Sequence, residues 1–241
     1  MSFTDLFIRK GSHPTSAAVI VAAGSSTRMG SDKLLAELGG IPVLARTLQA
    51  FDNSEYINEI VVVTRMDRVA EIADLCAEYK ISKVSKVVAG GKTRMESSLI
   101  GVSAVKDSAK LIAIHDAARP LVSGAVIKRT VCAAAAYMAA VPVVPSTDTL
   151  KVIDETDRIV GTVDRTTTYR VQTPQVFDAV LIKGALTKAS EKGLALTDDS
   201  AAVDMTGFKT CSVAGEEDNI KITTPRDLVI AEALLNSRSD L

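Results

Sequence analysis

The stretch that decides the fold is Ala17–Lys33, which reads AAVIVAAGSSTRMGSDK. Its first six residues form a short apolar run of Ala, Val and Ile, which is typical of a buried strand. The run leads directly into a loop of glycine, serine and cationic residues. Ligands of open α/β sheets bind outside the carboxyl ends of the strands, so this loop is expected to face a ligand.

The composition of this loop indicates that the ligand carries phosphate. Gly24, Ser25 and Ser26 can expose backbone N–H groups to an anion, and Arg28 and Lys33 bring two cations within reach of it. The loop is neither a dinucleotide-binding fingerprint, because serine stands at the second glycine position, nor a Walker A motif. The alternative is an ordinary strand–helix turn with solvated cations, but small residues, Arg and Lys together favour phosphate binding.

Apolar strands and helices alternate along the chain after this loop. Continuous apolar runs separated by helical segments are typical of a mostly parallel sheet with helices on both faces, so we expect a Rossmann-like α/β fold. The expected strands are 17–22, 60–64, 84–89, 111–115, 139–144, 150–153, 158–163, 209–213 and 219–223, and the expected helices are 42–51, 67–79, 93–105, 123–137, 179–192 and 225–236.

The composition excludes several classes of function. The chain has 241 residues and a formal net charge of −1, which argues against a nucleic-acid binder that relies on bulk positive charge. No apolar run approaches the roughly 20 residues that span a bilayer. Two histidines and three scattered cysteines form no zinc motif and no disulfide framework. We therefore expect a cytoplasmic protein with no nucleic-acid or membrane partner.

The alternation breaks between Pro145 and Pro174, where polar and β-branched residues replace the helices. The two short strands expected there would form a hairpin with no helix beside it, which is marginally stable alone. Pairing with a second copy would stabilise an arm at about 146–173, so a homodimer is expected; the alternative is a hairpin that folds back on its own domain. We expect an N-terminal extension over 1–16 and a single domain over 17–238 that carries the arm.

The motif GGKTRMES at 90–97 again joins a predicted strand to a predicted helix. Thr93 and Glu96 have the spacing of a capping box at the start of that helix. Capping does not explain the glycine pair, which allows backbone to approach a ligand closely and suits a flat base.

The motif HDAARP at 115–120 ends another predicted strand. Asp116 with Arg119 three residues later suits a metal or hydroxyl ligand beside an anion clamp; the alternative is a helix-capping aspartate paired with its arginine. His115 follows an apolar run, so we expect a structural histidine rather than a catalytic base.

Three further motifs follow in the second half of the chain. They are VDR at 163–165 with QTPQ at 172–175, TDDS at 197–200, and DNIKITTP at 218–225. In the last one, strand alternation would place Lys221 on the face opposite its isoleucine neighbours. The alternative for Lys221 is a solvated side chain on an edge strand.

In this order, these motifs resemble the 2-C-methyl-D-erythritol 4-phosphate cytidylyltransferases from about Ala17 to Leu235. The resemblance implies an α/β nucleotidyltransferase fold with a β-arm that joins a homodimer. It also implies that CTP and 2-C-methyl-D-erythritol 4-phosphate react, with Mg²⁺, to give 4-diphosphocytidyl-2-C-methyl-D-erythritol and pyrophosphate in the non-mevalonate isoprenoid pathway.

The resemblance further implies roles for residues at matching motif positions. The catalytic cations would be Arg28, Lys33 and Lys221. The CTP site would comprise Ala22, Ala23, Gly24, Ser26, Gly91, Arg94, Ser97, Asp116 and Ala117. The polyol phosphate would be held by Asp116, Arg119, Thr149, Arg165, Thr173, Thr197 and Lys221, with Thr149 and Arg165 supplied by the partner's arm. Asp116 would also bind the metal ion.

The reaction that the resemblance implies agrees with a chain poor in histidine. A phosphate monoester is mostly dianionic at pH 7, so the nucleophile needs no general base. Positioning and electrostatic stabilisation dominate such transfers. The segment from Arg28 to Lys33 departs from the family, because it is shorter than usual and ends in Gly-Ser-Asp-Lys.

Two alternatives to this function stay open at the level of sequence. Ribitol 5-phosphate cytidylyltransferases share much of the motif set, although HDAARP favours methylerythritol phosphate. A non-catalytic nucleotide-binding protein of the same fold would have no need of Arg28, Lys33, Asp116 and Lys221 together.

Overall fold

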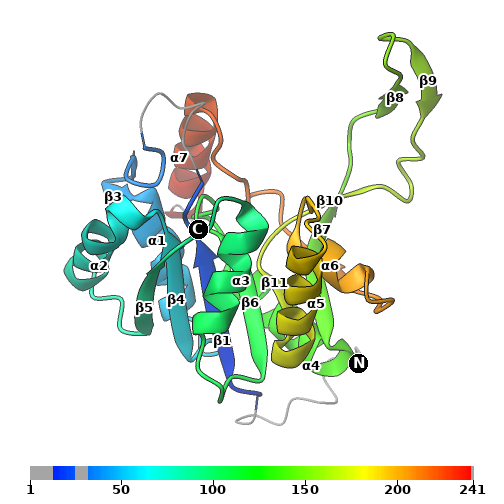
Figure 1. Cartoon of the computed structure of the whole chain (residues 1–241). Helices are drawn as coiled ribbons and strands as arrows, with labels where there is room; N and C mark the ends of the chain where they lie inside the picture. Colours follow the sequence, from blue (N-terminus) through cyan, green and yellow to red (C-terminus); the bar gives the residue numbers. More distant parts are fainter. Residues whose placement is uncertain (1–12, 25–31, 240–241) are drawn as a thin grey trace, which may run out of the picture.

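A mixed eight-stranded sheet forms the centre of the computed structural model, which describes residues 13–24 and 32–239 (Figure 1). Along the sheet the order is β10-β7-β11-β6-β1-β4-β5, with β12 paired to β7. The strands are β1 (Ser16–Val21), β4 (Glu59–Thr64), β5 (Val84–Ala89), β6 (Leu111–Asp116), β7 (Ala139–Pro145), β10 (Tyr169–Val171), β11 (Gln175–Asp178) and β12 (Cys211–Ala214).

Most of the neighbouring strands are parallel. β1 runs parallel to β4 and β6, β4 to β5, and β12 to β7, whereas β11 is antiparallel to β6 and β7, and β10 to β7. Parallel strands that are buried on both faces explain the continuous apolar runs in the sequence. The prediction of a mostly parallel α/β fold is confirmed.

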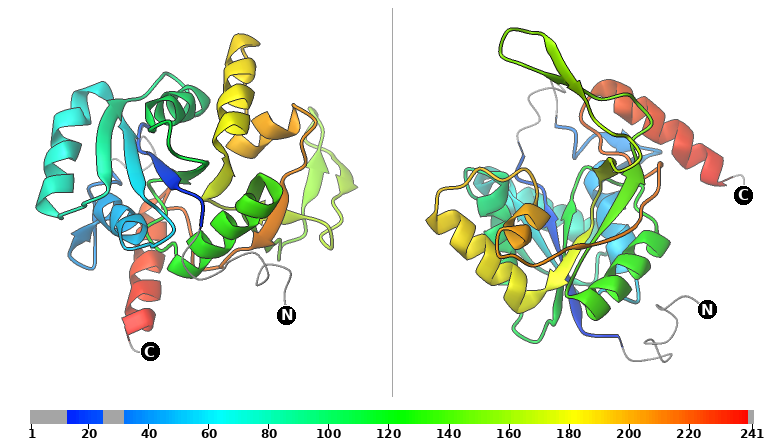
Figure 2. Two further views of the ribbon diagram at one scale, coloured as in Figure 1. Left: turned by 90° about the horizontal axis from the view of Figure 1, so that it is seen from below. Right: turned by 90° about the vertical axis from the view of Figure 1, so that its right-hand side faces the viewer.

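Helices cover both faces of the sheet (Figure 2). Alternate residues of β1 divide between two apolar clusters, Ala18 and Ile20 in one, Ala17 and Val19 in the other. The first cluster includes residues of α1 (Val43–Asp52), α2 (Val69–Glu78), α4 (Gly124–Tyr137) and α7 (Pro225–Ser239), and the second those of α3 (Arg94–Ala104), α5 (Ala179–Glu191) and α6 (Asp199–Asp204). Small additions are the hairpin β2 (Glu37–Leu38)–β3 (Ile41–Pro42) and the 3₁₀ turn η2 (Met66–Arg68).

One predicted strand is wrong, and five short elements were not predicted, namely β2, β3, β10, β11 and α6. Residues 219–223 form no strand, because their backbone bonds to loops: the Ile222 N–H donates to the Ala118 carbonyl, and the Asn219 N–H to that of Glu216. The unpredicted β11 has four residues directly after Pro174, and the unpredicted α6 has six. Among the described residues, no helix is long and apolar enough to cross a membrane.

The predicted hairpin consists of β8 (Lys151–Ile153) and β9 (Ile159–Thr162), which pair with each other antiparallel. It stands away from the central sheet (Figure 1). Ile153, Ile159 and Val160 on it are exposed, at 59%, 64% and 61%. Among the described residues the hairpin therefore does not pair with the central sheet of its own chain, and the arm that joins two copies stays a prediction.

Candidate active site

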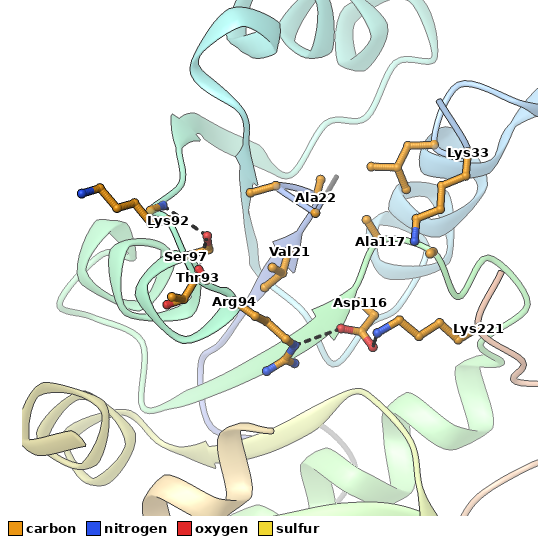
Figure 3. A pocket seen from close by; sticks show the side chains of 15 residues that line it. Val21, Ala22, Lys33, Lys92, Thr93, Arg94, Ser97, Asp116, Ala117 and Lys221 are labelled. Carbon is orange, nitrogen blue, oxygen red and sulfur yellow. Dashed lines mark hydrogen bonds and ion pairs between the residues drawn. The ribbon is translucent and has the colours of Figure 1, made fainter. Parts of the chain in front are cut away.

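A cavity of about 360 Å³ lies at the carboxyl ends of β1 and β6 and at the start of α3 (Figure 3). Its lining brings together ten of the predicted residues, namely Ala22, Ala23, Gly24, Lys33, Gly91, Arg94, Ser97, Asp116, Ala117 and Lys221. Lys92 and Thr93 also line it and were not predicted as site residues. Motifs far apart in the sequence therefore meet at the sheet edge where ligands of α/β proteins bind.

Asp116 is the electrostatic centre of this cavity. Its carboxylate lies 2.9 Å from Lys221 Nζ, 3.4 Å from Arg94 Nε and 3.6 Å from Arg119 Nε. Figure 3 shows Arg94 and Lys221 reaching it from opposite sides. Burial alone would raise the pKa of Asp116, but Arg94 and Lys221 outweigh it and hold that pKa well below its usual range. The carboxylate is therefore ionised at neutral pH.

A chain of hydrogen bonds through Thr173 and His115 fixes the backbone at Asp116. The Asp116 backbone N–H donates to Thr173 Oγ1 at 3.1 Å, and Thr173 Oγ1 lies 3.0 Å from Nδ1 of His115. His115 Nε2 lies 3.2 Å from the Arg119 carbonyl, which can only accept, so Nε2 carries the proton and Thr173 donates to Nδ1. Burial lowers the pKa of His115 to about 3, which keeps the ring neutral. The prediction of a structural histidine is confirmed.

Lys221 is positioned by the loop that replaces the predicted strand. Arg119 Nη1 donates to the Asn219 carbonyl at 2.7 Å, and Asn219 Nδ2 donates to the Thr173 carbonyl at 2.9 Å. Together with the bond from the Ile222 N–H to the Ala118 carbonyl, these contacts hold the backbone on either side of Lys221 near the end of β6. Arg119 is 12% exposed and lies behind Asp116, so the structure gives it a supporting position within this site.

The glycine-rich turn before α3 has packing reasons of its own. A Cβ on Gly90 would lie 2.7 Å from the Ala23 Cβ and from Ser97 Oγ, so only glycine allows this close approach. Thr93 caps α3 by accepting from the Glu96 N–H at 3.1 Å, and the Glu96 carboxylate accepts from the Lys92 N–H at 2.7 Å. The helix start is capped as predicted, although the Glu96 carboxylate bonds one residue before the cap.

Several predicted residues lie elsewhere. Thr173 is buried behind Asp116, whereas Thr149 and Arg165 are exposed on the arm. Thr197 is exposed too, and Asp198 rather than Thr197 caps α6. Ser26 and Arg28 lie outside the described residues.

The described part of the chain holds no cluster of three His, Cys, Asp or Glu side chains that would bind a metal ion by itself. Asp116 is a single ionised carboxylate at the cavity wall. Magnesium is often held by one or two carboxylates together with substrate phosphates and water. The site therefore fits a metal ion that arrives with a nucleotide, and does not fit a resident ion held by protein ligands alone.

The mostly parallel sheet, with a cavity at the carboxyl ends of its strands, has the α/β nucleotidyltransferase fold, as the match to solved structures shows. The family profile described as 2-C-methyl-D-erythritol 4-phosphate cytidylyltransferase matches residues 16–237. The chain belongs to this family and is a cytidylyltransferase.

Known relatives agree over nearly the whole length. The enzyme of this name from Caldanaerobacter subterraneus subsp. tengcongensis is 45% identical over 226 residues, covering 91% of this chain and 98% of that relative. The one from Halalkalibacterium halodurans is 41% identical, covering 91% and 96%. The crystal structure of 4-diphosphocytidyl-2C-methyl-D-erythritol synthase from Anaerococcus prevotii superposes with a TM-score of 0.83 at 32% identity, covering 92% and 96%.

Proposed function

We propose that the chain transfers CMP from CTP to 2-C-methyl-D-erythritol 4-phosphate, in the non-mevalonate route to isoprenoid precursors, with the cavity around Asp116 as the reaction site. The observation that carries this proposal is the convergence of Lys33, Arg94 and Lys221 on one cavity whose only lining carboxylate, among the described residues, is Asp116. An excess of cations suits a ligand with several negative charges. Membership of the cytidylyltransferase family supplies the identity of the nucleotide and of the acceptor.

The reaction joins two anions, so the main barrier is electrostatic. The acceptor phosphate attacks the α-phosphorus of CTP, the new P–O bond forms in line with the leaving oxygen, and pyrophosphate departs with the bonding electron pair. Lys33 and Lys221 stabilise the charge that builds up in the transition state, with Arg28 as a third cation from the loop. In this proposal the phosphates lie beside Ala23 and Gly24, and the turn at Gly91 accommodates the cytosine.

Magnesium completes the charge balance in this proposal. Asp116 is the residue that would hold it, together with the triphosphate. When bound, the ion neutralises phosphate charge and orients the leaving pyrophosphate.

The arm extends the proposal to a homodimer, and membership of a family of metabolic enzymes supports a cytoplasmic location. Thr149 and Arg165 are exposed on an arm that stands away from the described sheet of its own chain (Figure 1). Exposed Ile153, Ile159 and Val160 give the arm an apolar surface that a second copy would cover. In such a dimer, Arg165 and Thr149 reach the acceptor phosphate of the partner.

A pyrophosphate-release assay with CTP and either polyol phosphate tests the proposal. Turnover with 2-C-methyl-D-erythritol 4-phosphate, abolished by chelation of Mg²⁺, is expected. The family assignment does not favour ribitol 5-phosphate, so turnover with it should be far slower. Faster release with ribitol 5-phosphate would overturn the proposed acceptor, and no release with either would overturn the proposed reaction.

A further inference from the structure

Asp199 is a buried carboxylate for which the proposed reaction has no role so far. It stands in the first turn of α6, and its side chain is 1% exposed. Its Oδ2 atom lies 2.7 Å from Nη2 of Arg94, a residue 105 positions earlier in the chain. A carboxylate is rarely buried to this degree without a strong partner, and Arg94 is that partner.

Arg94 is consequently shared between two carboxylates. Its Nη2 faces Asp199, while its Nε lies 3.4 Å from Oδ1 of Asp116 on the cavity side. Burial would lower the pKa of Arg94, but Asp199 and Asp116 raise it above its usual value. The guanidinium is planar and rigid, so fixing one end of it fixes the orientation of the other.

The segment that carries Asp199 is itself anchored. Asp198 caps α6 by accepting from the Ala201 N–H at 3.1 Å, and it accepts from Gln175 Nε2 at 2.8 Å. The Ser200 N–H donates to Gln175 Oε1 at 2.9 Å. Gln175 begins β11, next to β6, so Asp199 is held on the central sheet rather than on a free loop.

We propose that Asp199 is a positioning residue of the transfer reaction: it holds the Arg94 guanidinium against Asp116. This matters when the substrate phosphates bind Lys221 and draw it away from Asp116. The inference rests on the proposed function. In the structure, Lys221 and Arg94 both bind Asp116. A phosphate entering the cavity competes for Lys221, and Asp116 then depends on Arg94 for its charge partner and orientation. Arg94 could itself turn toward the phosphates if Asp199 did not retain it.

The first test compares Asp199→Asn with Asp178→Asn in the purified full-length protein. Asn keeps the volume of the side chain but removes the charge that retains Arg94. Asp178 is the control because it is another aspartate at the start of a helix, as the cap of α5, but it lies at the far end of β6, paired with Leu111. We expect Asp199→Asn to lower kcat roughly 10- to 100-fold with a smaller change in the KM for CTP, because misplaced catalytic groups affect the transition state most. Asp178→Asn should change kcat by less than twofold. An unchanged kcat for folded Asp199→Asn would overturn the inference in favour of a structural role.

A double-mutant cycle with Arg94→Gln tests whether Asp199 acts through Arg94. If it does, Asp199→Asn should cost little further kcat in the Arg94→Gln background, whereas full additivity would overturn the inference. Melting temperatures and CTP affinity by calorimetry are measured on all four proteins. If the native chain itself shows no turnover, the proposed function fails; the inference is then judged on CTP affinity, where the same non-additivity is expected and additivity overturns it.

Discussion

The polar side chains around Asp116, which we call the floor of the cavity, and those of the arm are held in opposite ways. The floor consists of Asp116 with its contacts His115, Thr173, Arg94, Arg119 and Lys221. There, Asp116 is fixed by Thr173, which lies 57 residues away in the chain, and by three cations, one at the start of α3 and two in the loops after β6 and before α7. On the arm, Asp154 and Asp164 bond only locally among the described residues, with Thr156 and Thr166 two positions on. The floor is therefore organised by the fold of one chain, whereas the arm is a locally determined element that presents its residues outward.

This difference predicts where substitutions act. A residue on the floor should affect the chemical step in any assembly state, since one chain positions it. A residue on the arm should act only through what the arm contacts.

The largest effect is expected for the two lysines of the cavity to which the proposal gives a catalytic role, Lys221 and Lys33. Lys221→Ala and Lys33→Ala should each lower kcat by about 10²- to 10³-fold, the typical loss for one preorganised charge partner in a transition state. Pyrophosphate release under saturating CTP and acceptor measures it. Lys110→Ala is the matched control, because Lys110 is exposed and adjoins Leu111 at the other end of β6. Near-normal turnover of either variant would remove that lysine from the mechanism.

A smaller effect, confined to one substrate, is expected for the arm. Arg165→Ala should raise the KM for the sugar phosphate roughly 10- to 100-fold and leave the KM for CTP unchanged, because it removes one charged hydrogen bond to the acceptor. Arg158→Ala, on the same hairpin, should have no such effect. Equal changes in both KM values would contradict the separation between arm and floor.

A second substitution on the arm tests whether dimer formation contributes to binding of the sugar phosphate. Val160→Asp places a charge on its exposed apolar surface and should yield monomers by light scattering at micromolar concentration. Its KM for the sugar phosphate should rise as much as that of Arg165→Ala, with no further rise in the double variant. Met66→Asp is the control, since Met66 is 78% exposed on η2 and outside the arm. Dimers of Val160→Asp would show that the arm is not the interface.

The sequence predicted the parts of the molecule that depend on short-range patterns. The apolar run of β1 and the cap of α3 at Thr93 can each be recognised from a few consecutive residues. β11 was missed because four residues after a proline carry little pattern, and its place follows only from pairing with β6 and β7.

The same limit explains the errors in the site. Residues 219–223 alternate like a strand, but the backbone N–H groups of Asn219 and Ile222 donate to the carbonyls of Glu216 and Ala118, which lie in loops. Asp199 lies inside the TDDS motif, but its burial and its distance of 2.7 Å from Arg94, which distinguish it from the helix-capping Asp198, follow from the folded chain alone. Long-range contacts of this kind leave no mark in a single sequence.

The smallest effect is the pH dependence of stability that the buried His115 contributes, and it tests whether the floor is rigid. Burial lowers the pKa of His115 to about 3, below its value of about 6.5 in an unfolded chain. Between these values the unfolded chain binds a proton that the folded one does not, so the free energy of unfolding falls as pH falls. This histidine should contribute a slope of about 1.4 kcal/mol per pH unit. The depressed pKa of Asp116 contributes its own loss only below about pH 4, whereas burial raises the pKa of Asp199, which adds a dependence of opposite sign. The share of His115 is therefore the difference in slope between the native chain and a His115 variant in denaturant titrations from about pH 4.5 to 6.5.

His115→Gln should flatten this slope while lowering stability at every pH, because glutamine does not titrate and fills the ring's place imperfectly. His13→Gln is the matched control: His13, the other histidine, stacks on Tyr56 outside the floor, so the slope should persist in that variant. A slope that survived in His115→Gln would mean that water or a rearranged Thr173 lets the imidazole protonate in place. The floor would then be as adaptable as the arm, and the contrast between the two regions would lie in their position rather than in their rigidity.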